Sequence, residues 1–75
     1  MKEELNKLGF NSVKTLTGHI HIKSFDYFDL VIEELNGDNV VSLKEEGEIG
    51  MVKEIVLRFG ADLEWVTNFI KLFND

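Results

Sequence analysis

Residues 27–44 have the sequence YFDLVIEELNGDNVVSLK, and this stretch decides the fold that we predict. Before the central Asn36-Gly37 pair, the apolar residues Phe28, Leu30 and Ile32 fall on one face of an extended chain. Asn and Gly both tolerate the positive φ that a tight hairpin turn requires. The stretch therefore predicts a β-hairpin, with one strand over Tyr27–Leu35 and a returning strand over Val40–Lys44.

The residues before this hairpin predict one more strand and a short helix. From Val13 to Phe25, apolar and polar residues alternate, which is typical of a strand with one apolar face. Gly18 lies within this pattern, so we expect a bulge or a close approach of another backbone there. Residues 2–8 predict a helix that ends at Gly9.

The residues after the hairpin predict two helices. The first has an apolar stripe at helical spacing, formed by Ile49, Val52, Ile55, Val56 and Phe59. Asp62 is a suitable N-cap for the second, whose stripe is Val66, Phe69, Ile70 and Phe73. We therefore expect one two-layer α+β domain over residues 1–75. It has a three-stranded antiparallel sheet, a short N-terminal helix and two C-terminal helices, in the order α-β-β-β-α-α.

Composition limits the class of protein. The 75 residues include no cysteine, which excludes disulfides and thiolate metal sites and favours a cytoplasmic protein. The N-terminal residues lack the apolar core of a signal peptide, and no apolar run reaches 18 residues. A domain of this size leaves little room for an enclosed substrate cavity. We therefore expect no membrane span, no cofactor and no enzymatic activity.

Negative charge is concentrated in one part of the chain. The net charge is −6, yet residues 26–48 hold eight carboxylates and one lysine, so the rest of the chain is nearly neutral. This balance argues against direct nucleic-acid binding, which depends on clustered Lys and Arg. Solvated acidic faces are common, but such a block also suits docking to a basic protein partner. The candidate partner-binding residues are Asp26, Tyr27, Asp29, Glu33, Glu34, Asp38, Glu45, Glu46 and Glu48.

The aromatic residues have two expected roles. Phe25 and Tyr27 flank Asp26, where an exposed ring among carboxylates would anchor a partner. Five other aromatics are expected in the core, and these are Phe28, Phe59, Trp65, Phe69 and Phe73.

His19 and His21 are the weak candidates for a metal site. Their side chains share one strand face about 7 Å apart, and Asp26 or Asp29 could add a carboxylate ligand. Two histidines that alternate with isoleucine are more often the polar face of a strand, so we expect no metal. None of the common nucleophile, phosphate-loop or zinc-protease motifs is present.

The chain resembles a family of small phage-encoded anti-CRISPR proteins that inhibit the type II RNA-guided nuclease. The similar passages are Val13–Gly18, Leu30–Ser42 and Met51–Phe59. The resemblance implies the α-β-β-β-α-α order and a role in blocking DNA recognition by carboxylates that mimic phosphates. The residues that it implies for this role are Asp29, Glu33, Glu34, Asp38, Glu45 and Glu46.

Three functional hypotheses follow. The first is a phage-type inhibitor in the host cytoplasm that acts as a DNA mimic and binds the basic groove of a nucleic-acid-processing protein such as a nuclease. The alternative is an antitoxin or immunity protein that neutralises a toxin through the same acidic surface. A metal-dependent enzyme that uses His19 and His21 is the third.

Overall fold

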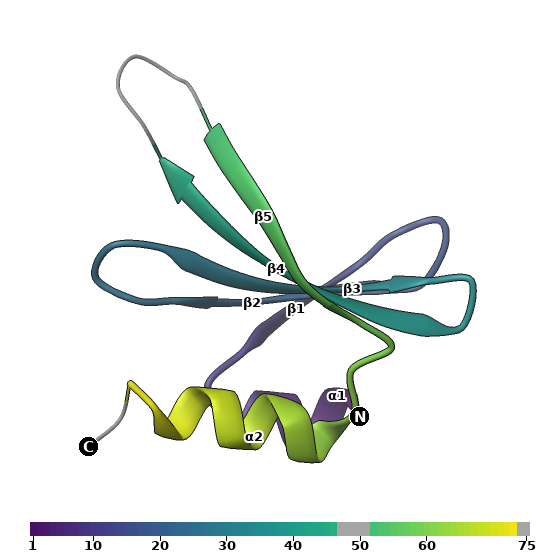
Figure 1. The fold of residues 1–75 in the computed structure, drawn as a ribbon. Helices are drawn as coiled ribbons and strands as arrows, with labels where there is room; N and C mark the ends of the chain where they lie inside the picture. The colour runs from purple at the N-terminus through teal and green to yellow at the C-terminus, as the bar shows by residue number, and fades with distance from the viewer. Residues whose placement is uncertain (47–51, 74–75) are drawn as a thin grey trace.

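The fold was obtained as a computed structural model, which describes residues 1–46 and 52–73 (Figure 1). Five strands form one antiparallel sheet in which each strand lies beside its neighbour in sequence. The α+β class agrees with the expectation, but the three-stranded sheet and the two C-terminal helices were wrong. The elements are α1 (Lys2–Lys7), β1 (Asn11–Lys14), β2 (His19–Ser24), β3 (Asp29–Leu35), β4 (Asp38–Glu46), β5 (Val52–Phe59) and α2 (Leu63–Lys71).

The alternating segment over residues 13–25 is a hairpin and not one strand. The Thr15 N–H donates to the Gly18 carbonyl at 2.7 Å, and this bond closes the turn between β1 and β2. Gly18 has φ +152°, and a Cβ built there would lie 3.1 Å from Cβ of Glu34. The atoms closest to Gly18 are therefore those of the Glu34 side chain and not the predicted second backbone, and the glycine lies in a chain reversal.

The predicted helix before Gly60 is a strand where the structure describes it. Val52–Phe59 forms β5, which pairs with β4 from Glu46↔Val52 to Val40↔Phe59 with one register shift. The spacing of apolar residues in this segment fits a helix, but Val52, Ile55 and Val56 are β-branched and favour a strand. Pairing with β4 decides the outcome, because it satisfies backbone groups that β4 would otherwise leave open. Ile49 lies outside the described residues.

The predictions that depend on a few adjacent residues, namely the turn, the helix end and the helix cap, were correct. Asn36 has φ +50° and Gly37 has φ +84°, so both central residues of the β3–β4 turn adopt the predicted positive values. Gly9 follows α1 with φ +99°. Asp62 caps α2 through its Oδ1, which accepts the Trp65 N–H at 2.8 Å.

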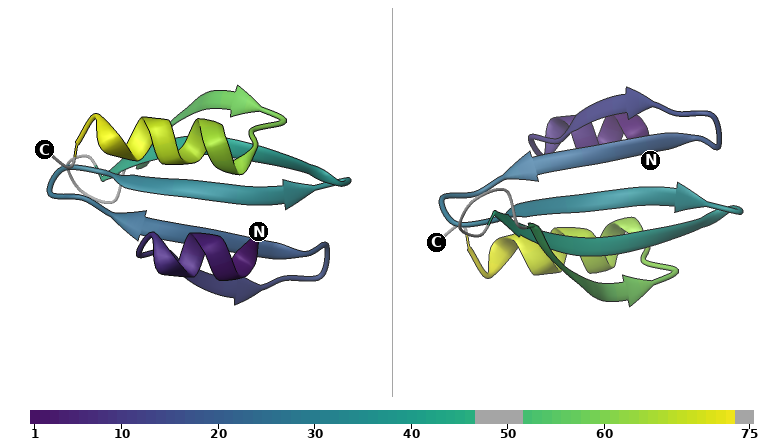
Figure 2. Two further views of the ribbon diagram at one scale, coloured as in Figure 1. Left: turned by 90° about the horizontal axis from the view of Figure 1, so that it is seen from below. Right: turned by 90° about the horizontal axis from the view of Figure 1, so that it is seen from above.

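Both helices lie on one face of the sheet, α1 over its N-terminal side and α2 over its C-terminal side (Figures 1 and 2). The core lies between them and the strands, and consists of Leu5, Phe10, Leu30, Ile32, Val41, Ala61, Val66 and Ile70. No helix of the described residues covers the opposite face, which we call the helix-free face. Of the helices described, neither is long and apolar enough to cross a membrane.

Candidate partner-binding site

An open pocket of about 430 Å³ lies at the end of the sheet where β2 turns into β3. The Phe25 N–H donates to the Phe28 carbonyl at 2.8 Å and closes this turn. The β3–β4 register places Asp29 opposite Lys44, which brings the end of β4 alongside the turn. We call this cavity the turn pocket, and its lining consists of Phe25, Asp26, Tyr27, Phe28, Asp29, Lys44 and Glu45.

The aromatic side chains of the turn pocket divide into a support and an exposed ring. Phe25 and Phe28 stack with their centroids 4.9 Å apart, and both contact Phe73 of the C-terminal segment at 5.5 and 5.3 Å. Tyr27 is 86% exposed at the tip of the turn. The expected exposed aromatic is therefore Tyr27, whereas Phe25 is partly buried against the core.

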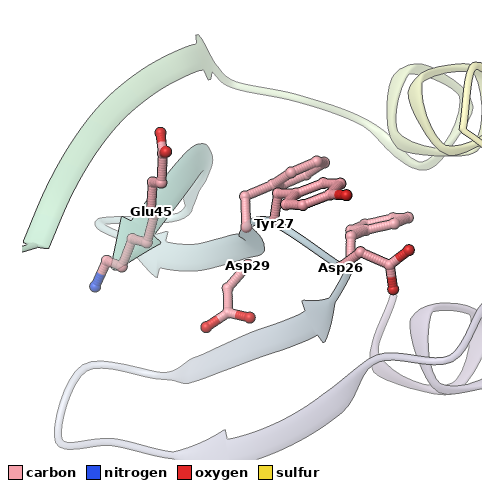
Figure 3. A pocket seen from close by; sticks show the side chains of 7 residues that line it. Asp26, Tyr27, Asp29 and Glu45 are labelled. Carbon is pink, nitrogen blue, oxygen red and sulfur yellow. The ribbon is translucent and has the colours of Figure 1, made fainter. Parts of the chain in front are cut away.

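Three carboxylates surround Tyr27, and we call Asp26, Tyr27, Asp29 and Glu45 the acidic rim. Figure 3 shows these carboxylates spread around the tyrosine ring and not converging on one point. All three are exposed, and no cation of the described residues lies within 4 Å of them. The arrangement suits several separate contacts with a partner surface better than one metal ion.

The other predicted acidic residues lie away from the acidic rim. Glu33 shares the helix-free face with Asp29, but Val31 lies between them and is only 4% exposed. Glu34 points to the helix side, where its Oε1 lies 3.0 Å from Nδ1 of His19. Asp38 follows the Asn36-Gly37 turn at the far end of β3. The fold therefore divides the acidic block, which is the set of carboxylates within residues 26–48, between two ends of the sheet as far as these residues are described. Glu46 ends β4, and Glu48 lies outside the described residues.

The two histidines belong to a polar network between α1 and the first two strands. Their rings stack with centroids 5.9 Å apart, and His21 is only 1% exposed. Ser12 Oγ lies 2.7 Å from Nδ1 of His21, and Asn6 Nδ2 donates to Ser12 Oγ at 2.9 Å. Burial lowers the pKa of the His21 imidazole. Sequence reasoning missed Asn6 and Ser12, because their proximity depends on the β1–β2 hairpin.

This network does not assemble a metal site. Within residues 1–46 and 52–73, no group of three or more metal-binding side chains comes together. Asp26 and Asp29, the suggested additional ligands, line the turn pocket and not the histidine pair. His19 instead bonds to Glu34, and His21 bonds to a hydroxyl group.

The aromatic residues of α2 form a second surface feature. Trp65, Phe69 and Phe73 follow one another with centroid distances of 5.3 and 5.2 Å, and we call them the aromatic row. Trp65 and Phe69 are partly buried and pack against the core, as expected. Two core predictions were wrong, because Phe59 lies on the edge strand β5 and is 71% exposed, and Phe73 is 48% exposed.

Comparison of the chain with protein-family models, with curated proteins and with solved structures finds no match.

Proposed function

We propose that this protein is a small acidic binding protein that docks its acidic rim onto a basic groove of a partner protein and blocks that groove. One observation carries the proposal. An exposed tyrosine stands among three exposed carboxylates over an open pocket, and although Lys44 also lines this pocket, none of the three carboxylates is within 4 Å of a cation of the described residues. Such a surface is complementary to Lys and Arg side chains.

Arginine is the partner residue that fits the acidic rim best. A guanidinium group can stack on the Tyr27 ring while its N–H groups donate to Asp26 or Asp29. The stacked Phe25 and Phe28 rings support the turn, so we expect little ordering entropy to be lost on binding. Lysine would pair with the same carboxylates as a point charge but would lack the planar stacking.

Grooves rich in Lys and Arg are typical of proteins that bind nucleic acids. We therefore propose a nucleic-acid-processing protein, such as a nuclease, as the class of partner. The acidity of the chain and the exposed acidic rim support this proposal. The resemblance to anti-CRISPR proteins contributes less, because the three-stranded order that it implied does not occur in this fold. The proposed contact is also narrower than the full acidic block, since Glu33, Glu34 and Asp38 lie elsewhere.

A charge-matched pair of variants tests this proposal. The test variant combines Asp26→Asn, Asp29→Asn and Glu45→Gln. The control combines Glu3→Gln, Glu54→Gln and Glu64→Gln, which are exposed residues outside the turn pocket. Wild-type and variant proteins are immobilised, exposed to bacterial lysate, and the bound proteins are identified by mass spectrometry. Binding of the purified partner is then measured by calorimetry at several salt concentrations.

We expect the wild type and the control to retain a nucleic-acid-binding partner that DNA or RNA displaces. Its affinity should fall with added salt, because exposed charges are screened. The test variant should bind at least about tenfold more weakly, equal to about 1.4 kcal/mol. Equal binding by both triple variants would show that the acidic rim is only a solvated surface.

A further inference from the structure

His21 is an almost fully buried histidine at the junction of three elements. Its ring lies on the helix side of β2, where the register places Ser12 of β1 on one side and Ile32 of β3 on the other. Asn6 reaches Ser12 from α1. We call Asn6, Ser12 and His21 the histidine latch, because together they connect α1 and β1 to β2.

The hydrogen bonds of the latch run in one direction. The Asn6 amide nitrogen donates to the Phe10 carbonyl oxygen at 3.0 Å and to Ser12 Oγ at 2.9 Å. A carbonyl oxygen can only accept, so the Asn6 atom in these bonds is the amide nitrogen. Ser12 Oγ lies 2.7 Å from Nδ1 of His21. We assign the Ser12 hydroxyl as the donor in this bond, which places the proton of the neutral ring on Nε2. A proton added to Nδ1 would turn this atom into a donor, so the Ser12 hydroxyl hydrogen would have to leave the bond and the ring would carry its charge where His21 is only 1% exposed.

The charges around His21 act in opposite directions on its pKa. Burial outweighs them and makes the net shift downward, whereas Glu34 of β3 raises that pKa, although its Oε1 is bonded to His19 of β2. The groups that oppose a second proton are the stacked His19, Lys2 of α1 and the terminal amino group. Lys23 lies on the same face of β2, and Lys14 of β1 lies opposite His19.

We propose that the histidine latch is an acid-sensitive switch, in which protonation of His21 detaches residues 1–14 while the remainder of the sheet and α2 stay folded. The segment is suited to local release, because β1 has four residues and, in the described sheet, lies at the edge and pairs with β2. Release exposes Leu5, Phe10 and the edge of β2, so acid would create an apolar surface and an open strand edge.

The direction of the pH effect follows from proton linkage. Burial holds the pKa of His21 below its ordinary value of 6.5, so the detached state binds more protons than the latched state in the range just below 6.5. The stabilising contribution of the latch is therefore complete above pH 6.5. It is lost progressively as the pH falls through the lowered pKa.

The test is an NMR titration of the full chain from pH 7.5 to pH 4.5. At pH 7.5, the chemical shifts of the His21 ring nitrogens should show the tautomer with the proton on Nε2. On acidification, the amide signals of residues 1–14 should lose their dispersion with the same midpoint as the His21 ring, while those of β3 and β4 persist. Protonation of His21 without release of the segment would overturn the proposal, and so would simultaneous loss of all dispersed signals.

Two variants separate the role of His21 from that of His19. His21→Asn retains an acceptor near the position of Nδ1 and does not titrate, so residues 1–14 should stay docked at acid pH. His19→Asn removes the more exposed histidine and should keep the transition. If His19→Asn abolished the transition and His21→Asn kept it, the transition would be assigned to the His19–Glu34 pair and the proposal would be overturned.

Ser12→Ala gives an independent measurement if His21→Asn does not fold. This variant removes the hydrogen bond that favours the neutral ring, so release should occur at a higher pH than in the wild type. An unchanged midpoint would contradict the proposed role of the latch.

Discussion

The two helices cover the same sheet face but are held there by different chemistry. Leu5 is the buried residue of α1, and the helix is also tied to β1 and β2 by the polar chain from Asn6 to His21. By contrast, α2 buries Val66 and Ile70, and its aromatic row extends the apolar contact towards Phe25. The N-terminal side therefore depends on a titratable group, whereas the C-terminal side depends mainly on apolar burial.

This difference predicts two levels of stability in one small domain. The free energy gained from apolar burial does not depend on protonation. A buried neutral histidine stabilises the fold less as the pH falls, because the unfolded chain takes up a proton more readily. The N-terminal side also includes the short strand β1 at the edge of the described sheet. We expect it to open locally at a lower free energy than the sheet around β3 and β4.

The largest expected effect comes from shortening a core residue of α2. Ile70→Ala removes buried atoms from a side chain that is 4% exposed, so we expect a loss of about 2–5 kcal/mol in the free energy of unfolding. Urea titration followed by circular dichroism measures this loss. A loss below about 1 kcal/mol would show that α2 contributes little to the core.

Leu5→Ala makes the corresponding change in α1, where the side chain is fully buried. Its effect on the global transition should be smaller than that of Ile70→Ala, because the loss is limited to the free energy of detaching residues 1–14. Hydrogen exchange should therefore accelerate in β1 far more than in β3. Equal acceleration in both strands would show that the two sides unfold as one unit.

Asp62→Ala removes the N-cap of α2 and should cost about 1 kcal/mol. Asp62→Asn keeps an oxygen that can accept the Trp65 N–H, so it should retain most of the stability. The fluorescence of Trp65, the single tryptophan, reports the unfolding of this helix. Equal losses in the two variants would indicate that the charge, and not the hydrogen bond, stabilises the helix.

Tyr27→Ser is expected to have the smallest effect on stability, within about 0.5 kcal/mol, because the ring is exposed. The same change should weaken binding of the partner through loss of the aromatic anchor. Phe28→Ser is the contrasting variant, since its partly buried ring supports the turn. A large stability loss in Tyr27→Ser would mean that the ring has a structural role.

The sequence predicts the fold best where a few adjacent residues determine the conformation. The Asn36-Gly37 turn and the Asp62 cap depend on local φ values and one side-chain hydrogen bond. In contrast, Val52–Phe59 has the apolar spacing of a helix, and its strand conformation comes from pairing with β4. A periodicity argument on one segment does not include that partner.

The candidate site could likewise be predicted only where it depends on local sequence. The two-residue turn at Asn36-Gly37 fixes the β3–β4 register, so the approach of Asp29 to Lys44 and Glu45 could be derived from the sequence. Strand alternation also predicts that Glu33 and Glu34 point to opposite faces. The contact of Phe25 and Phe28 with Phe73 could not be derived, because it depends on where α2 crosses the sheet.

The sequential order of the strands has a consequence for how the chain folds. Each described strand pairs with a neighbour in sequence, so the sheet can grow outwards from the β3–β4 hairpin one strand at a time. Most of its contacts have low sequence separation, which reduces the entropy lost in closing loops. We therefore expect fast refolding for a sheet protein, which stopped-flow measurement of Trp65 fluorescence would detect as a phase of milliseconds or less.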